Sequence, residues 1–400
     1  MSETLNYVPF SDLAHVNPIT QLPAQGECTF LSMSDVTDDG KISSSQVRDV
    51  RASGGYTPFQ DQDVLFAKIT PCMENGKGAL AENLISGCGF GSTEFHVLRA
   101  SELSNSRFVA QWAKSHLLRQ KAEAFMVGSA GQRRVPASFF SRFRVLFLSL
   151  AEQRRIAEVL DAADEAIDAS VACIEKLYLT KDGLVSTILS GLKCRASVGL
   201  SELSEVASGV TLGGSLVGSG SKFPCITVTN VQDGHLDLSE VKKIHLPESS
   251  SSRYLLHPGD FLMTEGGDFD KLGRGAVWNN EIEDCLYQNH IFRIRCNQSR
   301  LLPDFLSIYS ASWHGKNYFR LASKQSTNLA SINSTQVKEF PVPLISLEEQ
   351  QRIISIVQAH DERIAAERAR LEKLRKLKTG LMDDLLTGRV RVGRLDELPV

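Results

Sequence analysis

The chain has 400 residues, of which 42% are hydrophobic and 23% are charged, a composition typical of folded globular proteins that excludes disorder. The length predicts two or more domains, and no segment approaches the roughly 20 apolar residues of a membrane-spanning helix. The net charge of −3 argues against a protein that holds nucleic acid by bulk charge alone.

The start of the chain, Met1 to Thr4, lacks the basic and apolar pattern of a secretory signal. The eight cysteines form no CxxC pair, and no histidine spacing completes a zinc site. These features predict a cytoplasmic protein with reduced thiols and without a metal site.

Residues 1–148 have the pattern of a mixed α/β domain. The apolar run from Asp63 to Lys68 predicts a strand. Breaks rich in Gly and Asn, at 74–76 and 87–89, separate such runs. A helical stretch follows near 104–125, so the segment predicts one globular domain with both kinds of element.

A long helix is predicted over residues 149–195. Ser149 and Glu152 have the spacing of a capping box, in which the Ser hydroxyl accepts from a free backbone N–H and the Glu side chain reaches back. Gly191 stands where a left-handed C-terminal cap is expected. Between them the apolar steps alternate four and three, as in a coiled coil: Ile156, Leu160, Ala163, Ile167, Ser170, Ile174, Leu177, Lys181, Leu184 and Ile188.

The second half of the chain repeats the first. The sequence FRVLFLSLAEQRRIAEVL from Phe143 matches FPVPLISLEEQQRIISIV from Phe340, an offset of 197 residues that holds without a gap to the end of the helix. Upstream, the same offset aligns Asp63 with Asp260. The repeat predicts a second domain over 196–345, with a strand around Ile294 and a helical stretch near 303–321. A second long helix with the C-terminal tail follows over 346–400.

Each helix has about 40 residues and a length of roughly 60 Å, which is too long to be buried against its own domain. We therefore expect the two helices to form an intramolecular antiparallel coiled coil that relates the two domains by a pseudo-two-fold axis. Polar seam residues, Ser170 with Glu367 and Lys181 with Lys378, are positioned to fix the register. An ordinary dimerisation coiled coil is the alternative.

A search for catalytic motifs returns none. The chain has no GxxxxGK[ST] phosphate loop, no complete GxGxxG fingerprint, and no HExxH or GxSxG motif. It also lacks the Asn-Pro-Pro-aromatic and Asp-Pro-Pro-Tyr motifs of amino-methyltransferases. The sequence therefore predicts a binding or scaffolding protein rather than an enzyme.

The duplicated order of mixed domain and long helix, with SLxEQxRI opening each helix at Ser149 and Ser346, resembles the specificity subunits of Type I restriction–modification systems. The segments that precede the helices, 131–136 and 326–333, resemble that family as well, as do 91–95 and Gly259 with Asp260. Residues 143–149 depart from the family pattern because they lack its prolines, whereas the second copy keeps Pro341 and Pro343.

The resemblance implies a non-catalytic subunit in which each globular domain is a target-recognition domain for one half of a bipartite double-stranded DNA site. It implies that the helices act as a spacer between the half-sites, so that spacing becomes part of specificity. The implied partners are two copies of the modification subunit and a restriction subunit. S-adenosylmethionine is expected on the partner methyltransferase, and no cofactor is expected on this chain.

Basic residues gather in two stretches, 113–144 and 293–325, whose only acidic residues are Glu123 and Asp304. The loop before each helix aligns across the repeat. We expect DNA contacts there, because Arg suits guanine edges and Gln or Asn suits adenine edges. The candidates in these loops are Gln132, Arg133, Arg134, Lys324, Gln325 and Asn328. Further phosphate contacts are expected from Lys68, Lys77, Lys271 and Arg274.

Three other functions are weighed against this one. A methyltransferase or nuclease would bind S-adenosylmethionine or a metal by itself. A coiled-coil adaptor would have no affinity for DNA even with its partners present. A specificity-like subunit of another DNA-modifying defence system would share these sequence features, and a neighbouring methyltransferase gene would distinguish it.

Overall fold

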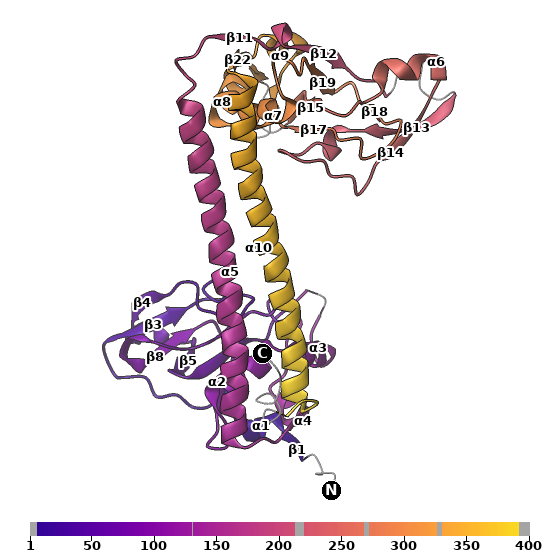
Figure 1. The fold of residues 1–400 in the computed structure, drawn as a ribbon. Helices are drawn as coiled ribbons and strands as arrows, with labels where there is room; N and C mark the ends of the chain where they lie inside the picture. Colours follow the sequence, from indigo (N-terminus) through magenta and orange to yellow (C-terminus); the bar gives the residue numbers. More distant parts are fainter. Residues whose placement is uncertain (1–5, 130, 213–219, 268–271, 326–329, 392–400) are drawn as a thin grey trace. The chain divides into compact units, whose positions relative to one another are not determined.

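The computed structural model describes residues 6–129, 131–212, 220–267, 272–325 and 330–391. The chain divides into two compact units. Unit 1 comprises residues 1–172 and 368–400, and unit 2 comprises residues 173–367. Each unit contains one globular part and half of each long helix, as drawn in Figure 1.

Unit 1 contains two four-stranded sheets and a strand pair. The first sheet has the order β2 (Ala14–Val16), β9 (Phe95–Ala100), β6 (Asp63–Ala67) and β7 (Gly78–Leu80), with antiparallel neighbours throughout. The second has the order β4 (Gln46–Asp49), β3 (Glu27–Leu31), β8 (Cys88–Gly91) and β5 (Thr57–Gln60), and β3 and β8 are parallel. The pair consists of β1 (Tyr7–Pro9) and β10 (Arg144–Leu146).

The short helices of unit 1 are α1 (Phe10–Leu13), α2 (Ser106–Lys114), α3 (His116–Ala124) and α4 (Ser138–Arg142), with 3-10 turns η1 (Val50–Ser53) and η2 (Ile85–Gly87). The predicted helical stretch near 104–125 is thus two helices. Asn105 caps α2 by accepting from Phe108 N, and Ser115 caps α3 by accepting from Leu118 N. Ser115 has an extended backbone, which separates the two.

Unit 2 repeats this plan. Its first sheet has the order β12 (Ser204–Ser208), β19 (Ile291–Cys296), β15 (Asp260–Thr264) and β17 (Gly275–Val277). Its second has the order β14 (Lys242–Leu246), β13 (Ser221–Ile226) and β18 (Leu286–Tyr287), and β13 and β18 are parallel, like β3 and β8. The pair β11 (Ser197–Gly199) and β22 (Pro341–Pro343) matches β1 and β10.

Unit 2 also has a small sheet of β16 (Gly266–Gly267), β21 (Ala330–Ser331) and β20 (Lys324–Gln325). Its helices are α6 (Glu248–Ser251), α7 (Pro303–Ala311), α8 (Trp313–Ala322) and α9 (Ser334–Lys338), with 3-10 turns η3 (Leu200–Glu202), η4 (Val228–Asn230) and η5 (Ser252–Tyr254). The predicted strands at 63–68 and around Ile294 are confirmed as β6 and β19.

The two long helices are α5 (Leu150–Ser190) and α10 (Leu347–Thr387), which lie side by side in Figure 1. In unit 1, Ile156 and Leu160 near the start of α5 share a core with Leu385 and Leu386 near the end of α10. In unit 2, Leu189 near the end of α5 shares a core with Ile353 near the start of α10. The helices therefore pack antiparallel within each unit, as the sequence predicts.

The register of the helix pair is marked by ion pairs in place of facing lysines. Lys378 donates to Asp164 in unit 1, and Lys181 donates to Asp361 in unit 2. The two pairs are equivalent under the 197-residue repeat. The expected pairing of Lys181 with Lys378 is therefore wrong. Each ammonium lies against a carboxylate, which attracts it, whereas two facing lysines would repel each other.

Candidate nucleic-acid interface

The predicted contact loop of unit 1 is a short hairpin. Val127 and Arg134 exchange two backbone hydrogen bonds of 3.0 and 2.9 Å, and Ile69 forms a further bridge with Arg134. Gly128, with a φ of +127°, permits the turn, because a Cβ there would stand 2.8 Å from the Gln132 carbonyl oxygen. The hairpin is therefore hydrogen-bonded to the segment that directly follows β6.

The corresponding segment of unit 2 has the same arrangement. Strands β20 and β21 are antiparallel, and β16, which follows β15, pairs with β21. The offset of 197 residues carries the bridge partners Ile69, Val127 and Arg134 onto β16, β20 and β21. Both units therefore place a hairpin at the same position of the fold, shortly before the long helix that follows in sequence.

Unit 1 brings three of the predicted basic residues together. Lys68, Arg133 and Arg134 lie on adjacent backbone, since Thr70 N donates to the Arg133 carbonyl and Val135 N donates to the Lys68 carbonyl. Gln132 is exposed at the turn. These four candidates form one local surface, which we call the unit 1 hairpin surface.

Both arginines of this surface are paired with glutamates in the free chain. Arg134 binds Glu94 through Nε at 3.0 Å and Nη2 at 2.8 Å, and Arg133 Nη2 lies 3.2 Å from Glu74 Oε1. The hydrogen bonds from Arg134 hold the pKa of Glu94 below its usual value. The arginine side chains remain 39% and 42% exposed, so a phosphate or base edge can reach them by competing with a carboxylate.

Lys77 and Arg274 occupy equivalent positions and make equivalent contacts. Lys77 Nζ donates to the carbonyls of Met33 and Val36 at 3.1 and 3.2 Å. Arg274 Nη2 donates to the Val228 carbonyl at 3.3 Å and its Nη1 to Gln232 Oε1 at 3.0 Å. Each side chain fastens the loop after the parallel strand to the first sheet, so both residues have a structural role within their unit.

The remaining candidates are placed less fully. Lys324 and Gln325 form β20, and their backbone alone is described. Lys271 and Asn328 lie outside the described residues. Unit 2 therefore shows the position of the hairpin but not the side chains at its turn.

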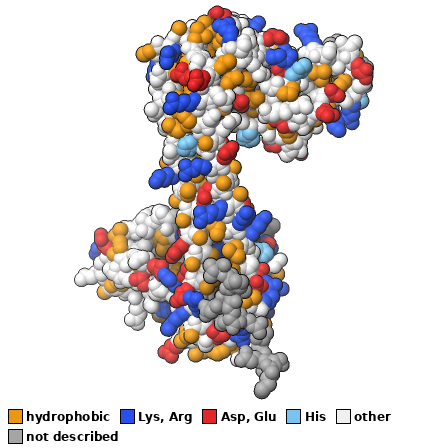
Figure 2. All heavy atoms as spheres, viewed as in Figure 1, with side chains coloured by type: hydrophobic (Ala, Val, Ile, Leu, Met, Phe, Trp, Pro, Cys, Tyr) orange, Lys and Arg blue, Asp and Glu red, His pale blue; other side chains and the backbone are white. Residues whose placement is uncertain are grey.

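The basic stretches of the sequence do not form one basic face. Arg119 is buried and donates to the carbonyls of Ala113 and Met73, both at 2.8 Å. Arg295 binds the buried carboxylate of Asp260. On the face shown in Figure 2, Lys and Arg side chains are interspersed with Asp and Glu. The clustering of basic residues along the sequence therefore suggested more positive charge on the surface than these side chains provide.

A buried glutamine that sequence reasoning did not single out fastens each long helix to its domain. Gln153 accepts from Asn105 N at 3.0 Å and donates to the carbonyls of Leu103 and Leu148, both at 2.9 Å. Its side chain is fully buried with all three contacts satisfied.

The second copy of this anchor is Gln350. It accepts from Leu302 N at 2.8 Å and donates to the carbonyls of Arg300 and Ile345 at 2.8 and 3.2 Å. All three partners follow the same offset of 197 residues as the glutamines themselves. The available sequence signal was the Glu-Gln pair that both repeats share, because this contact requires the side-chain amide of the glutamine.

A bidentate ion pair is also repeated at the centre of the first sheet. Arg99 binds Asp63 through two bonds of 2.7 Å, and Arg295 binds Asp260 in the same way. Each carboxylate also accepts a backbone N–H, from Gln60 and His257 respectively, at 2.8 Å. The repeated aspartate therefore has a structural role in each unit.

The ranges covered by the structure contain no group of three or more His, Cys, Asp and Glu side chains that could hold a metal ion. Among the helices placed in the structure, none is both long and apolar enough to cross a membrane.

The chain is similar to known proteins in both sequence and fold. A family model described as the Type I restriction modification DNA specificity domain matches residues 196–376. The Type I restriction enzyme EcoEI specificity subunit of Escherichia coli is 37% identical over 161 residues, which cover 39% of this chain and 27% of that protein. The aligned regions span between 27% and 39% of the length of the first curated relatives.

Solved structures match over nearly the whole chain. A chain from a structural study of complex assembly in the type I restriction–modification system has a TM-score of 0.64 at 19% identity, covering 98% of this chain and 99% of that one. The HsdS subunit from Thermoanaerobacter tengcongensis has a TM-score of 0.57 at 18% identity, covering 98% of each chain. At these identities the likeness concerns the fold. Residues 196–376 therefore belong to the family of Type I restriction modification DNA specificity domains, and the chain as a whole has the fold of the solved HsdS subunit.

Proposed function

We propose that this chain reads a bipartite double-stranded DNA sequence, with one half-site for each globular domain, and carries no catalytic centre of its own. The recognition domains are residues 1–148 and 196–345. The observation that supports this function most directly is the repeated hairpin: two units of the same fold each present one at the same position before a long helix. Two equivalent readers suit a site of two halves.

The partners follow from the family. We propose that two copies of a modification subunit bind S-adenosylmethionine and methylate adenine at the site, and that a restriction subunit joins them. Because the chain has a net charge of −3 and its hairpin arginines are paired with glutamates, we expect the partners to contribute much of the affinity for phosphate.

A genome-wide methylation map tests this function. In a host that keeps its methyltransferase, deletion of the gene for this chain should remove one bipartite methyladenine motif, and the intact gene should restore it. The double variant Arg133→Ala with Arg134→Ala should restore the motif only weakly, whereas Arg51→Ala should restore it fully. Arg51 is a suitable control because it also pairs with a carboxylate, Asp49, on the surface of unit 1.

A map that does not change on deletion would contradict the specificity function. Full methylation by the double variant, together with unchanged DNA affinity of the assembled complex across a salt series, would remove the unit 1 hairpin surface from the interface.

A further inference from the structure

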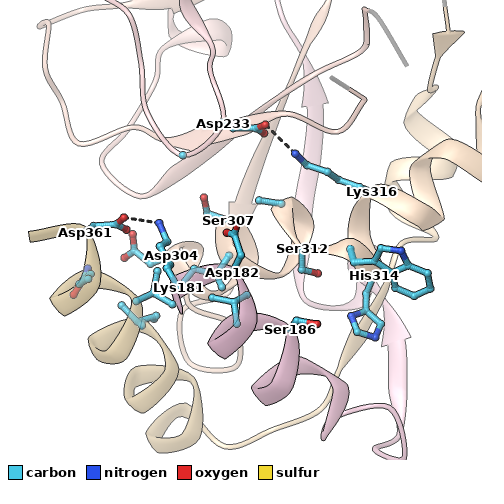
Figure 3. A pocket seen from close by; sticks show the side chains of 18 residues that line it. Lys181, Asp182, Ser186, Asp233, Asp304, Ser307, Ser312, His314, Lys316 and Asp361 are labelled. Atoms are coloured by element: carbon cyan, nitrogen blue, oxygen red, sulfur yellow. Dashed lines mark hydrogen bonds and ion pairs between the residues drawn. The ribbon is translucent and has the colours of Figure 1, made fainter. Parts of the chain in front are cut away.

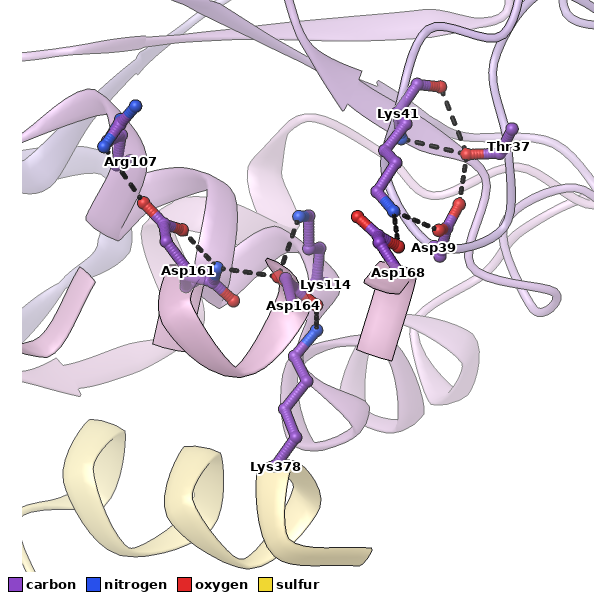
Figure 4. A network of polar contacts seen from close by, with 10 residues as sticks. Thr37, Asp39, Lys41, Arg107, Lys114, Asp161, Asp164, Asp168 and Lys378 are labelled. Carbon is purple, nitrogen blue, oxygen red and sulfur yellow. Dashed lines mark hydrogen bonds and ion pairs between the residues drawn. The ribbon is translucent and has the colours of Figure 1, made fainter. Parts of the chain in front are cut away.

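The equivalent clefts of the two units differ in charge. In unit 1, side chains of α2 extend to the beginning of α5 and form a polar network (Figure 4). Lys114 Nζ lies 3.4 Å from Asp164, Gln111 donates to Asp161 at 2.7 Å, and Arg107 lies 3.4 Å from Asp161. The cleft beside them has a volume of about 430 Å³.

Asp164 is the centre of this network, because Lys378 from α10 binds it as well. Burial alone would raise the pKa of Asp164, but the charges of Lys114 and Lys378 and their contacts outweigh it and hold the pKa below its usual value. The side chain is only 16% exposed. In unit 1, therefore, two lysines cover one carboxylate.

Unit 2 keeps the carboxylate but has lost the basic residues of its own domain. Asp361 corresponds to Asp164, and Lys181 still binds it. The residues that correspond to Arg107, Gln111 and Lys114 are Asp304, Ile308 and Ala311. Without a second lysine above it, the Asp361 side chain is 51% exposed.

A cavity of about 730 Å³ lies at this place, and we call it the unit 2 cavity. Its lining includes four aspartates, Asp182, Asp233, Asp304 and Asp361, and two lysines of opposite charge, Lys181 and Lys316 (Figure 3). Lys316 is bound to Asp233 at 3.0 Å. Within the described ranges, Asp182 and Asp304 form no ion pair, so the cavity retains an excess of negative charge.

Two further groups define what fits the cavity. His314 also lines it, and burial, aided by the charge of Lys193, lowers the pKa of this imidazole, so that it adds no positive charge at pH 7. Trp313 stands at the cavity with 65% of its surface exposed, and Ile354 and Val357 add apolar lining. An aromatic side chain beside apolar and acidic groups suits a long side chain with an apolar stem and a cationic head.

We propose that the unit 2 cavity receives a lysine or arginine side chain of a modification subunit, whose cationic head takes the place that Lys114 occupies in unit 1. This inference rests on the proposed function for the identity of the partner. The physical reason is charge complementarity: the cavity keeps Asp361, the counterpart of Asp164, and adds carboxylates of its own, but it lacks the cation that completes the unit 1 network. The two repeats would then differ in how they hold their partner copies.

The substitution Ala311→Lys tests this directly, because it restores the lysine of unit 1 at the end of α7. We expect it to weaken binding of the purified modification subunit by at least about tenfold in a titration followed by light scattering. Asp304→Asn should weaken binding about threefold and reduce its salt dependence. The control Lys316→Gln removes a positive charge beside the cavity and should not weaken binding.

A second measurement does not depend on the partner. The chain has three tryptophans, and Trp112 and Trp278 are buried, so only the Trp313 indole resonance should shift when arginine amide is added to the full chain. The shift should disappear in the Ala311→Lys variant.

The outcomes are distinguishable. If Ala311→Lys folds and binds the modification subunit within twofold of the wild type, the inference is wrong while the proposed function stands. An unchanged Trp313 resonance at millimolar arginine amide would also overturn it. If the wild-type chain binds no modification subunit at all, the proposed partner fails, and with it the assignment of the cavity.

Discussion

At the scale of single residues, the feature that most clearly links domain to helix is the buried glutamine anchor, Gln153 and Gln350. An amide is the side chain that can accept one hydrogen bond and donate two from a buried site. In each unit it joins the loop before α2 or α7 to the first turn of α5 or α10. The anchor therefore fixes the direction in which the helix leaves its domain.

Replacing Gln350 by Ala should lower the free energy of unfolding of unit 2 by about 2–4 kcal/mol, because one buried N–H and two carbonyls lose their partner. Gln350→Glu should be at least as damaging at pH 7, since a carboxylate would face the carbonyls of Arg300 and Ile345, and less damaging at pH 4, where a protonated carboxyl can donate. Denaturant unfolding at both pH values measures this. The neighbouring exposed Gln351→Ala is the control, and an equal effect there would refute the anchor.

At the scale of elements, α5 and α10 are joined by two equivalent ion pairs in different surroundings. Asp164 and Lys378 are 16% and 15% exposed, and Lys114 adds a second cation, whereas Asp361 is 51% exposed. Water screens an exposed pair far more than a covered one. The same two residue types therefore contribute unequally to the two units.

We expect Lys378→Ala to destabilise unit 1 by about 1–3 kcal/mol and Lys181→Ala to destabilise unit 2 by less than about 1 kcal/mol. The contribution of Asp164 is present above its unfolded pKa, near 3.8, and is lost as the pH falls through the lowered folded value. Hydrogen exchange along α5, measured at pH 7 with correction for intrinsic rates, reports each unit separately. Equal losses in the two variants would show that the surroundings of the pair do not matter.

At the scale of the whole molecule, each unit is completed by residues distant in sequence. Met382, Leu385 and Leu386 belong to the core of unit 1 with Phe10 and Ile156, although more than 200 residues separate Met382 from Ile156 in the sequence. Leu189, in α5, belongs in turn to the core of unit 2. Each helix therefore supports the domain of the other repeat as well as its own.

Leu386→Ala should destabilise unit 1 by about 2–5 kcal/mol, through lost burial and the cavity that remains. Hydrogen exchange should rise in α1 and α4 and stay unchanged in α7 and α8. The repeat-equivalent Leu189→Ala should give the reverse pattern. If both variants loosened both units alike, the units would not be separate cooperative bodies.

The sequence alone determined the order of the two domains and the two long helices, and it indicated the family by resemblance. Repeat, heptad seam and capping boxes are local patterns, and they predicted two domains, two long helices and antiparallel packing, which α5 and α10 confirm. The capping box at Ser149 and Glu152 forms both of its hydrogen bonds. Such patterns depend on residues that are neighbours in the chain, so they can be recognised from the sequence alone.

Only the tertiary structure decided what the polar residues do. Lys181 and Lys378 looked like partners in the seam, but antiparallel packing sets each against an aspartate. Lys77 and Arg274, which the sequence predicts as phosphate contacts, donate to backbone carbonyls of their own unit, a role that no local pattern indicates. The alignment of the two repeats shows that Ala311 stands where unit 1 has Lys114. This difference gained a meaning only from the structure, in which Ala311 and Asp361 line the same cavity. The energy of a charge depends on its nearest neighbours in space, and those come from distant parts of the chain.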